Sequence, residues 1–162
     1  MTSARRYWLF KSEPDVFSFA DLMSARGRRT SWEGVRNYQA RNLLRDEVKK
    51  GDGVLFYHSS TEPMAIAGIA EVVSDGYSDH TALDPRAKYH DPASTRENPI
   101  WFMVDIAGVQ AFAEPLTRDR LKQEKALAGM MLLQRGSRLS IQPVTAAEWR
   151  CVLKLAGVAA DA

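Results

Sequence analysis

One apolar segment, residues 65–73, most constrains the fold that this chain can adopt. Apolar side chains occur on both of its alternating faces, and Gly68 lies inside it. A strand with this pattern is buried on both faces or bends within a barrel. The segments around it do not alternate regularly between strands and helices. We therefore expect an α+β fold, in which a small curved sheet or open barrel has short helices packed around it.

Local patterns predict the other elements. Further strands are expected at residues 6–11, 54–57, 100–109 and 138–142. Helices are expected to begin after the N-cap residues Ser18, Asn37, Thr117 and Thr145. The first of these helices should end at Gly27, the second near Lys49 and the last at Gly157. The segment around Trp32 is expected to be a loop.

Length and composition limit the class of protein. A chain of 162 residues with 45% hydrophobic and 26% charged residues is typical of one globular domain, which we expect to cover residues 1–157 and to leave 158–162 as a tail. No apolar run approaches the roughly 18 residues of a membrane span, so no membrane partner is expected. Cys151 is the single cysteine, which excludes an internal disulfide and indicates a reducing, cytoplasmic location.

Charge is distributed unevenly along the chain, although the net charge is only +2. Residues 26–50 contain eight basic and three acidic side chains, whereas residues 60–99 contain three basic and seven acidic ones. A local basic region is typical of nucleic-acid binding, but solvated helix faces also produce such a pattern.

Motifs for catalysis and for metal or phosphate binding are weak or absent. There is no G-x-S-x-G nucleophile motif and no glycine-rich phosphate loop, and the acidic and histidine residues of segment 79–91 match no standard metal spacing. His58 and Ser59 are neighbours on a predicted strand, where they would point to opposite faces. We expect neither a cofactor nor a metal. A small-substrate hydrolase or nucleotide-processing enzyme that uses His58 or the 79–91 segment remains the alternative function.

Trp32 is the aromatic residue with the clearest indication of binding. It precedes Arg36, Asn37 and the predicted basic helix. A flipped or single-stranded base needs an aromatic plane for stacking, polar groups for its edge and arginines for its phosphates. The helix N-terminus would add a favourable dipole for an anion. The alternative interpretation is a tryptophan in the core beside a solvated helix.

Six segments of the chain, together with Trp149, resemble the EVE domain family. Residues 32–42, Trp-Glu-Gly-Val-Arg-Asn-Tyr-Gln-Ala-Arg-Asn, are similar to its central signature almost letter for letter. The match continues at residues 7–14, 56–59, 68–73, 89–92, 138–144 and Trp149. It covers the chain from about residue 7 to residue 157, and it implies a PUA-like pseudo-barrel related to the PUA, YTH and ASCH domains.

The resemblance also implies a function, namely a non-catalytic reader of a modified base. The expected partner is DNA with a modified cytosine or RNA with a modified base, and an effector protein is a further expected partner. The positions that match the family and would form the base pocket are Ser12, Trp32, Val35, Asn37, Tyr38, Tyr57, His58 and Ser59. Those expected to hold phosphates are Lys11, Arg36 and Arg41.

Several of these residues have structural alternatives. Asn37 is expected mainly to cap its helix, and Tyr57 and His58 are both consistent with core positions. Arg41 has Asp46 and Glu47 within reach on the same helix. The sequence departs from the family at His90, where a second tyrosine is expected, and in its cluster of arginines at 26, 28 and 29.

Overall fold

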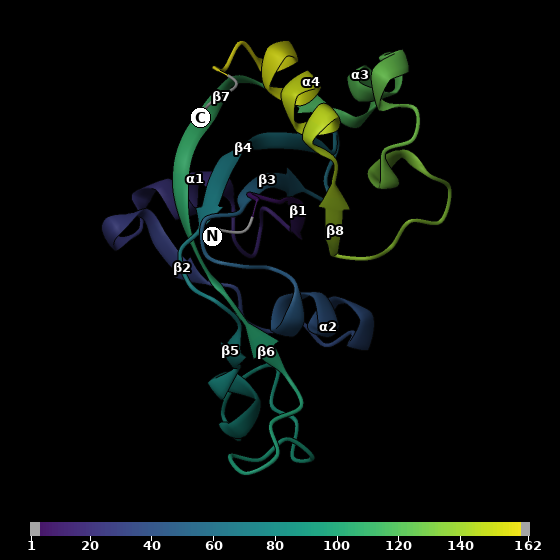
Figure 1. Cartoon of the computed structure of the whole chain (residues 1–162). Helices are drawn as coiled ribbons and strands as arrows, with labels where there is room; N and C mark the ends of the chain where they lie inside the picture. Colours follow the sequence, from purple (N-terminus) through teal and green to yellow (C-terminus); the bar gives the residue numbers. More distant parts are fainter. Residues whose placement is uncertain (1–3, 160–162) are drawn as a thin grey trace.

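A six-stranded mixed sheet forms the centre of the molecule in a computed structural model that describes residues 4–159 (Figure 1). Its strand order is β2-β7-β4-β3-β1-β8. The strands are β1 (Tyr7–Ser12), β2 (Arg29–Ser31), β3 (Gly53–His58), β4 (Ala65–Val72), β7 (Asp105–Thr117) and β8 (Ile141–Val144). Only the pairing of β1 with β3 is parallel among these described strands. The sheet curves into a half-barrel, so the predicted α+β, PUA-like fold is confirmed.

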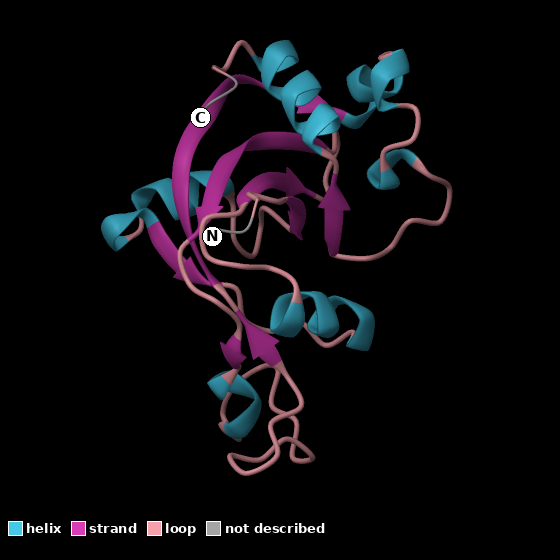
Figure 2. Ribbon diagram, viewed as in Figure 1, coloured by secondary structure: helices cyan, strands magenta, loops and turns pink. Residues whose placement is uncertain are grey.

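Short helices and a small two-stranded ribbon surround this sheet (Figure 2). The α-helices are α1 (Phe19–Ser24), α2 (Tyr38–Asp46), α3 (Arg118–Lys122) and α4 (Ala146–Ala156). The 3₁₀ helices are η1 (Arg26–Arg28), η2 (His80–Leu83), η3 (Lys125–Leu127) and η4 (Met131–Leu133). Strands β5 (Tyr77–Ser78) and β6 (Phe102–Met103) form the ribbon. None of the helices within residues 4–159 is long and apolar enough to cross a bilayer.

All four predicted N-caps are confirmed. The side chains of Ser18 and Thr145 each accept a hydrogen bond from the third helical N–H in a capping box, and Asn37 and Thr117 cap α2 and α3. Gly157 ends α4 in the left-handed conformation with φ of 72°, as expected. Val158 follows it and is a buried core residue, whereas residues 160–162 of the predicted tail lie outside the described residues.

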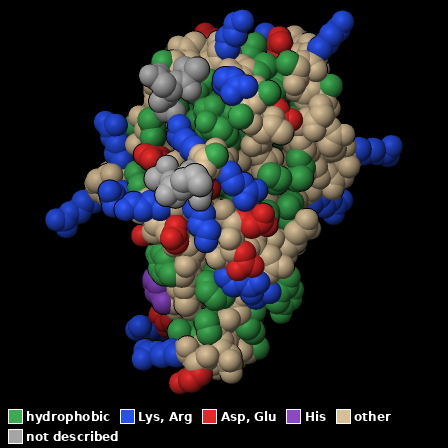
Figure 3. Space-filling model, in the orientation of Figure 1, with side chains coloured by type: hydrophobic (Ala, Val, Ile, Leu, Met, Phe, Trp, Pro, Cys, Tyr) green, Lys and Arg blue, Asp and Glu red, His purple; other side chains and the backbone are tan. Residues whose placement is uncertain are grey.

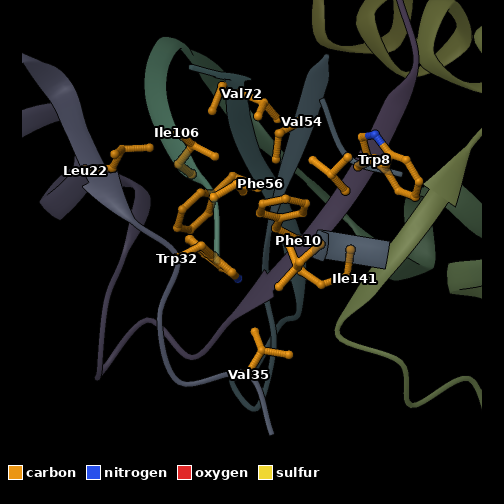
Figure 4. Packing of buried hydrophobic residues seen from close by; sticks show 14 of the residues in the cluster. Trp8, Phe10, Leu22, Trp32, Val35, Val54, Phe56, Val72, Ile106 and Ile141 are labelled. Carbon is orange, nitrogen blue, oxygen red and sulfur yellow. The ribbon is translucent and has the colours of Figure 1, made fainter. Parts of the chain in front are cut away.

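The sheet separates two hydrophobic cores. Alternation along β1 directs Trp8 and Phe10 into a first core with α1 and α2, shown in Figure 4, and directs Leu9 into a second core with α3 and α4. The same alternation occurs in β3, whereas in β4 a register shift between Ile66 and Gly68 places both Ile66 and Ile69 in the second core. Because both faces of the central strands are covered, the apolar pattern of residues 65–73 is explained by burial on both sides together with sheet curvature.

The predicted strand at residues 100–109 is wrong in its bounds. The chain leaves the β5–β6 ribbon at Val104 and then joins the main sheet as β7, which continues to Thr117. Val104 accepts a hydrogen bond from the Trp32 N–H at 2.8 Å, and the strand β2 that precedes Trp32 was not predicted. Val104 is the single residue between β6 and β7, so side-chain alternation alone does not reveal the change of partner strand.

Gly68 provides a test of this packing. A Cβ atom at Gly68 would lie 2.6 Å from the Phe19 ring and 2.7 Å from the Gln110 carbonyl oxygen. We expect Gly68→Ala to lower the free energy of unfolding by about 1–3 kcal/mol, because the strand backbone and an aromatic ring must both move. Gly129→Ala is the control, since no atom lies within 4 Å of its Cβ position. Equal stability of the two variants in urea denaturation would show that Gly68 is not closely packed.

Candidate functional site

A cavity of about 460 Å³ opens beside Trp32 on the face of the sheet that carries α1 and α2. It lies between the end of β1, the segment that follows β2, and the loop after η2. Its lining residues are Lys11, Ser12, Glu13, Val16, Phe17, Thr30, Ser31, Trp32, Glu33, Gly34, Val35, Arg36, Tyr89 and Ser140. A volume in this range fits a small ligand such as a nucleobase.

Trp32 belongs to both the cavity wall and the core. Its side chain is only 8% exposed and packs against Phe10 and Phe56, with ring centroids 5.2 Å and 5.5 Å away (Figure 4). The indole therefore fills the first core, as the alternative interpretation of the sequence expected, and it also borders the cavity. Its stacking on a base stays a prediction. Replacing the indole with a small residue would disrupt the core and the cavity wall at once.

The buried carboxylate of Asp79 fixes the segment that carries Trp32. It accepts hydrogen bonds from the Gly34 N–H at 2.8 Å, from Arg36 at 3.0 Å, and from the N–H and hydroxyl of Thr81. Burial alone would raise the pKa of Asp79, but the hydrogen bonds from Thr81, Gly34 and Arg36 outweigh it and hold this pKa below its usual value. Asp79 thus stays ionised and joins two loops that are distant in the sequence.

Arg36 and Gly34 complete this wall of the cavity. The Arg36 guanidinium donates two hydrogen bonds to the Tyr89 carbonyl oxygen, at 2.9 Å and 2.7 Å, and so positions the Tyr89 ring. That ring lies over Gly34, where an added Cβ would be 2.6 Å from it and where φ is +81°. Only glycine satisfies both conditions, because a side chain would clash with the ring and would strain the backbone.

The predicted pocket residues of β1 and of the central signature fall in different places. Ser12 and Val35 line the cavity with Trp32. Asn37 caps α2 through the Ala40 N–H and is a lining residue of a separate depression near Arg138. Tyr38 lies on the surface, 59% exposed, where its ring packs on Trp101 with centroids 4.9 Å apart.

The three predicted residues of β3 and the turn after it do not line this cavity. Tyr57 is buried in the second core, on the opposite face of the sheet. The His58 Nε2 accepts a hydrogen bond from the Phe19 N–H at 3.0 Å, and partial burial lowers the pKa of this imidazole. Ser59 donates its N–H to the Ser12 carbonyl oxygen at 3.0 Å and so supports the end of β1.

The basic residues expected at the rim are largely engaged within the protein. Arg36 forms the ion pair with Asp79, and Arg41 donates to the Ile100 carbonyl oxygen at 2.6 Å. Lys11 contributes to the cavity lining, but its Nζ donates to the Ser137 carbonyl oxygen at 3.1 Å. On the face shown in Figure 3, Lys and Arg side chains are interspersed with Asp and Glu rather than gathered in one patch.

Sequence reasoning missed several residues of the cavity, above all Thr30, Ser31, Glu33 and Tyr89. The first three lie within two residues of Trp32 in the sequence, so this closeness could have predicted them. Tyr89 reaches the cavity from a loop more than fifty residues away, and no local pattern predicts that contact. Within residues 4–159, no three His, Cys, Asp or Glu side chains are grouped to hold a metal ion.

Asp79 gives a test of the site's architecture. We expect Asp79→Asn to lower the free energy of unfolding by about 3 kcal/mol at pH 7, because it removes one partner of a buried ion pair. The pKa of Asp79 is depressed in the folded state, so its contribution is present at neutral pH and is lost as the pH falls through that pKa. The difference between variant and wild type should therefore shrink in acid.

Denaturation at a series of pH values measures this difference. Asp84→Asn is the matched control from the same loop, since Asp84 forms an exposed ion pair with Arg86 and should contribute little. An Asp79→Asn variant no less stable than Asp84→Asn would show that Asp79 does not hold the loops together.

Known proteins resemble this chain in sequence. It is 41% identical to chicken (Gallus gallus) thymocyte nuclear protein 1, with 92% of this chain and 68% of that protein aligned. It is 39% identical to the human thymocyte nuclear protein 1, with 92% of this chain and 73% of that protein aligned.

Solved structures share the fold. A protein from Pseudomonas syringae superposes with a TM-score of 0.87 at 49% identity, covering 93% of this chain and 99% of that one. Human THYN1 in complex with DNA containing 5-methylcytosine also gives a TM-score of 0.87, at 39% identity, with 93% and 97% covered. Residues 6–155 match the EVE domain, which agrees with the resemblance seen in the sequence. The chain therefore belongs to the EVE domain family.

Proposed function

We propose that this chain is a non-catalytic nucleic-acid-binding module that reads a modified base in the cavity beside Trp32. The observation that carries the proposal is this cavity, in a chain whose fold matches that of human THYN1 bound to 5-methylcytosine DNA. We therefore take 5-methylcytosine in DNA as the first ligand to test. RNA with a modified base, an effector partner and a cytoplasmic location stay predictions.

The chemistry of the lining supports a modified cytosine. Trp32 and Tyr89 offer aromatic surface for stacking, and Val35 is an apolar neighbour suited to a methyl group. The Ser12 hydroxyl donates to the Phe17 carbonyl oxygen at 2.5 Å, which leaves its lone pairs to accept from an amino group. The exposed Glu33 is a second acceptor for the amino group of cytosine.

Arginines just outside the cavity are suited to hold the phosphates. Arg28 and Arg29 are exposed and precede the lining residues Thr30 and Ser31 directly. Within residues 4–159 neither guanidinium forms an ion pair, unlike those of Arg36 and Arg45. We assign the phosphate contacts to Arg28 and Arg29 instead of Arg36, whose guanidinium is committed to Asp79 and Tyr89.

The groups that a hydrolase would need have other roles. His58 accepts a backbone hydrogen bond and lies outside the lining of the cavity. Asp91 accepts a hydrogen bond from the Trp101 indole at 2.7 Å, which holds the pKa of this carboxyl below its usual value. Burial raises the pKa of the Cys151 thiol, so its nucleophilic thiolate form is disfavoured. These arrangements favour binding over catalysis.

The first test replaces the indole while keeping an aromatic ring. We expect Trp32→Phe to weaken binding of an oligonucleotide containing 5-methylcytosine about 10-fold, because a smaller ring loses stacking area. Trp149→Phe is the matched control, since it removes an indole from the second core. Fluorescence anisotropy would give both dissociation constants, with circular dichroism confirming that each variant is folded. Wild-type affinity in Trp32→Phe would contradict the proposal.

The second test concerns the phosphate contacts. We expect Arg29→Gln to reduce the slope of log K against log salt concentration by about 1, and to weaken modified and unmodified DNA alike. Arg150→Gln serves as control, because Arg150 is an exposed residue of α4 on the other side of the sheet. Equal slopes for Arg29→Gln and wild type would show that Arg29 does not contact a phosphate.

A further inference from the structure

A second depression, of about 450 Å³, lies beside the Trp32 cavity and is called the arginine depression below. Its charged lining residues are Arg135 and Arg138, and among the described residues no aspartate or glutamate lines it. The Trp32 cavity, in contrast, is lined by Glu13 and Glu33 as well as by basic side chains. A concave surface lined by one sign of charge attracts the opposite charge, so the arginine depression is suited to an anion.

Both guanidiniums of the arginine depression are free to bind. In the part of the chain that the structure describes, the exposed side chains of Arg135 and Arg138 form neither an ion pair nor a hydrogen bond, unlike that of Arg36. Asn37 also lines the depression, and its Oδ1 accepts the Ala40 N–H, which leaves the amide N–H groups to donate. Guanidinium and amide donors are groups that bind phosphate oxygens.

The loop that carries the two arginines is held in place from the core side. The Gln142 side chain is 1% exposed, and its Nε2 donates to the Ser137 hydroxyl oxygen and the Leu139 carbonyl oxygen, both at 2.9 Å. The Lys11 Nζ donates to the Ser137 carbonyl oxygen at 3.1 Å. Lys11 and Ser140 line the first cavity, whereas Ser137 and Leu139 line the arginine depression. The two hollows are therefore neighbours that share one loop.

The arginine depression and the exposed arginines of β2 lie on opposite sides of the Trp32 cavity. Strands β2 and β8 are the two edges of the six-stranded sheet (Figure 1). The cavity lies between these edges, because it is lined by Thr30 and Ser31 of β2 and by Ser140, the residue before β8. Arginines 28 and 29 are at the β2 edge, and arginines 135 and 138 precede the β8 edge.

We propose that the arginine depression binds a backbone phosphate of the nucleic acid whose modified base occupies the Trp32 cavity. Arg28 and Arg29 hold a phosphate on one side of the read nucleotide, and Arg135 and Arg138 hold one on the other side. This inference rests on the proposed function and adds the path of the strand, which crosses the mouth of the cavity from β2 to β8. Such contacts position the strand and add affinity without reading its sequence.

The salt dependence of binding tests the contact. We expect the double variant Arg135→Gln/Arg138→Gln to reduce the slope of log K against log salt concentration by about 2, for modified and unmodified oligonucleotides alike. Arg150→Gln/Lys154→Gln is the matched control, because it removes two exposed charges from α4 over the second core. Circular dichroism checks that both variants are folded. A wild-type slope in the Arg135→Gln/Arg138→Gln variant would overturn the proposal.

Neutral linkages in the oligonucleotide test the path of the strand. Each of the two phosphates on either side of the 5-methylcytosine is replaced in turn by an uncharged methylphosphonate. Where the contacted phosphate is missing, Arg135→Gln/Arg138→Gln should cost little further affinity, because the partner of the arginines is already lost. Arg29→Gln should keep its effect on that oligonucleotide and lose it for a linkage on the other side. Additive effects of the double variant at all four linkages would contradict the proposed path.

Further outcomes separate this proposal from its alternatives. Free phosphate is excluded as the ligand if the double variant weakens oligonucleotide binding. A melting temperature that inorganic phosphate raises in wild type but not in the double variant, with unchanged oligonucleotide binding, would instead show a site for free phosphate and overturn the proposal. Failure of base reading has a different result, namely wild-type affinity in Trp32→Phe together with the reduced salt slope of the double variant.

Discussion

The buried carboxylate of Asp79 is the interaction on which the candidate site depends. It holds the Gly34 N–H and the Arg36 guanidinium, and Arg36 in turn holds the Tyr89 carbonyl oxygen. Without this charge, the Gly34 N–H would lose its acceptor and the Arg36 guanidinium would lose its counter-charge, so this wall of the cavity would be weakened. The acidic loop after β5 therefore holds the signature segment, residues 32–42, in position.

Trp32 shows why function and stability are hard to separate in a small half-barrel. Its indole packs on Phe10 and Phe56 and also borders the cavity, so a large truncation would weaken binding through unfolding alone. Arg36 likewise has a structural role, because its guanidinium binds Asp79 and the Tyr89 carbonyl oxygen. In the proposed function, the phosphates are therefore contacted by exposed arginines such as Arg29.

The sheet gives the protein two chemically different sides. One carries the Trp32 cavity, with aromatic rings, hydroxyls and carboxylates suited to a base. The other carries α3 and α4 over an apolar core that includes Tyr57. Strand alternation produces this division, because Leu9 and Phe10 are neighbours in sequence yet belong to different cores on opposite faces of the sheet.

The sequence by itself determined the features that depend on neighbouring residues. The caps at Ser18, Asn37 and Thr145, the doubly buried strand β4 and the family signature at residues 32–42 were all predictable, since each rests on a local pattern. Tertiary structure alone decided which side chains meet. Asp79 and Tyr89 reach the Trp32 segment across more than forty residues, and strand parity directs Tyr57 into the core on the other face of the sheet. Such contacts arise from chain topology, to which local periodicity is insensitive.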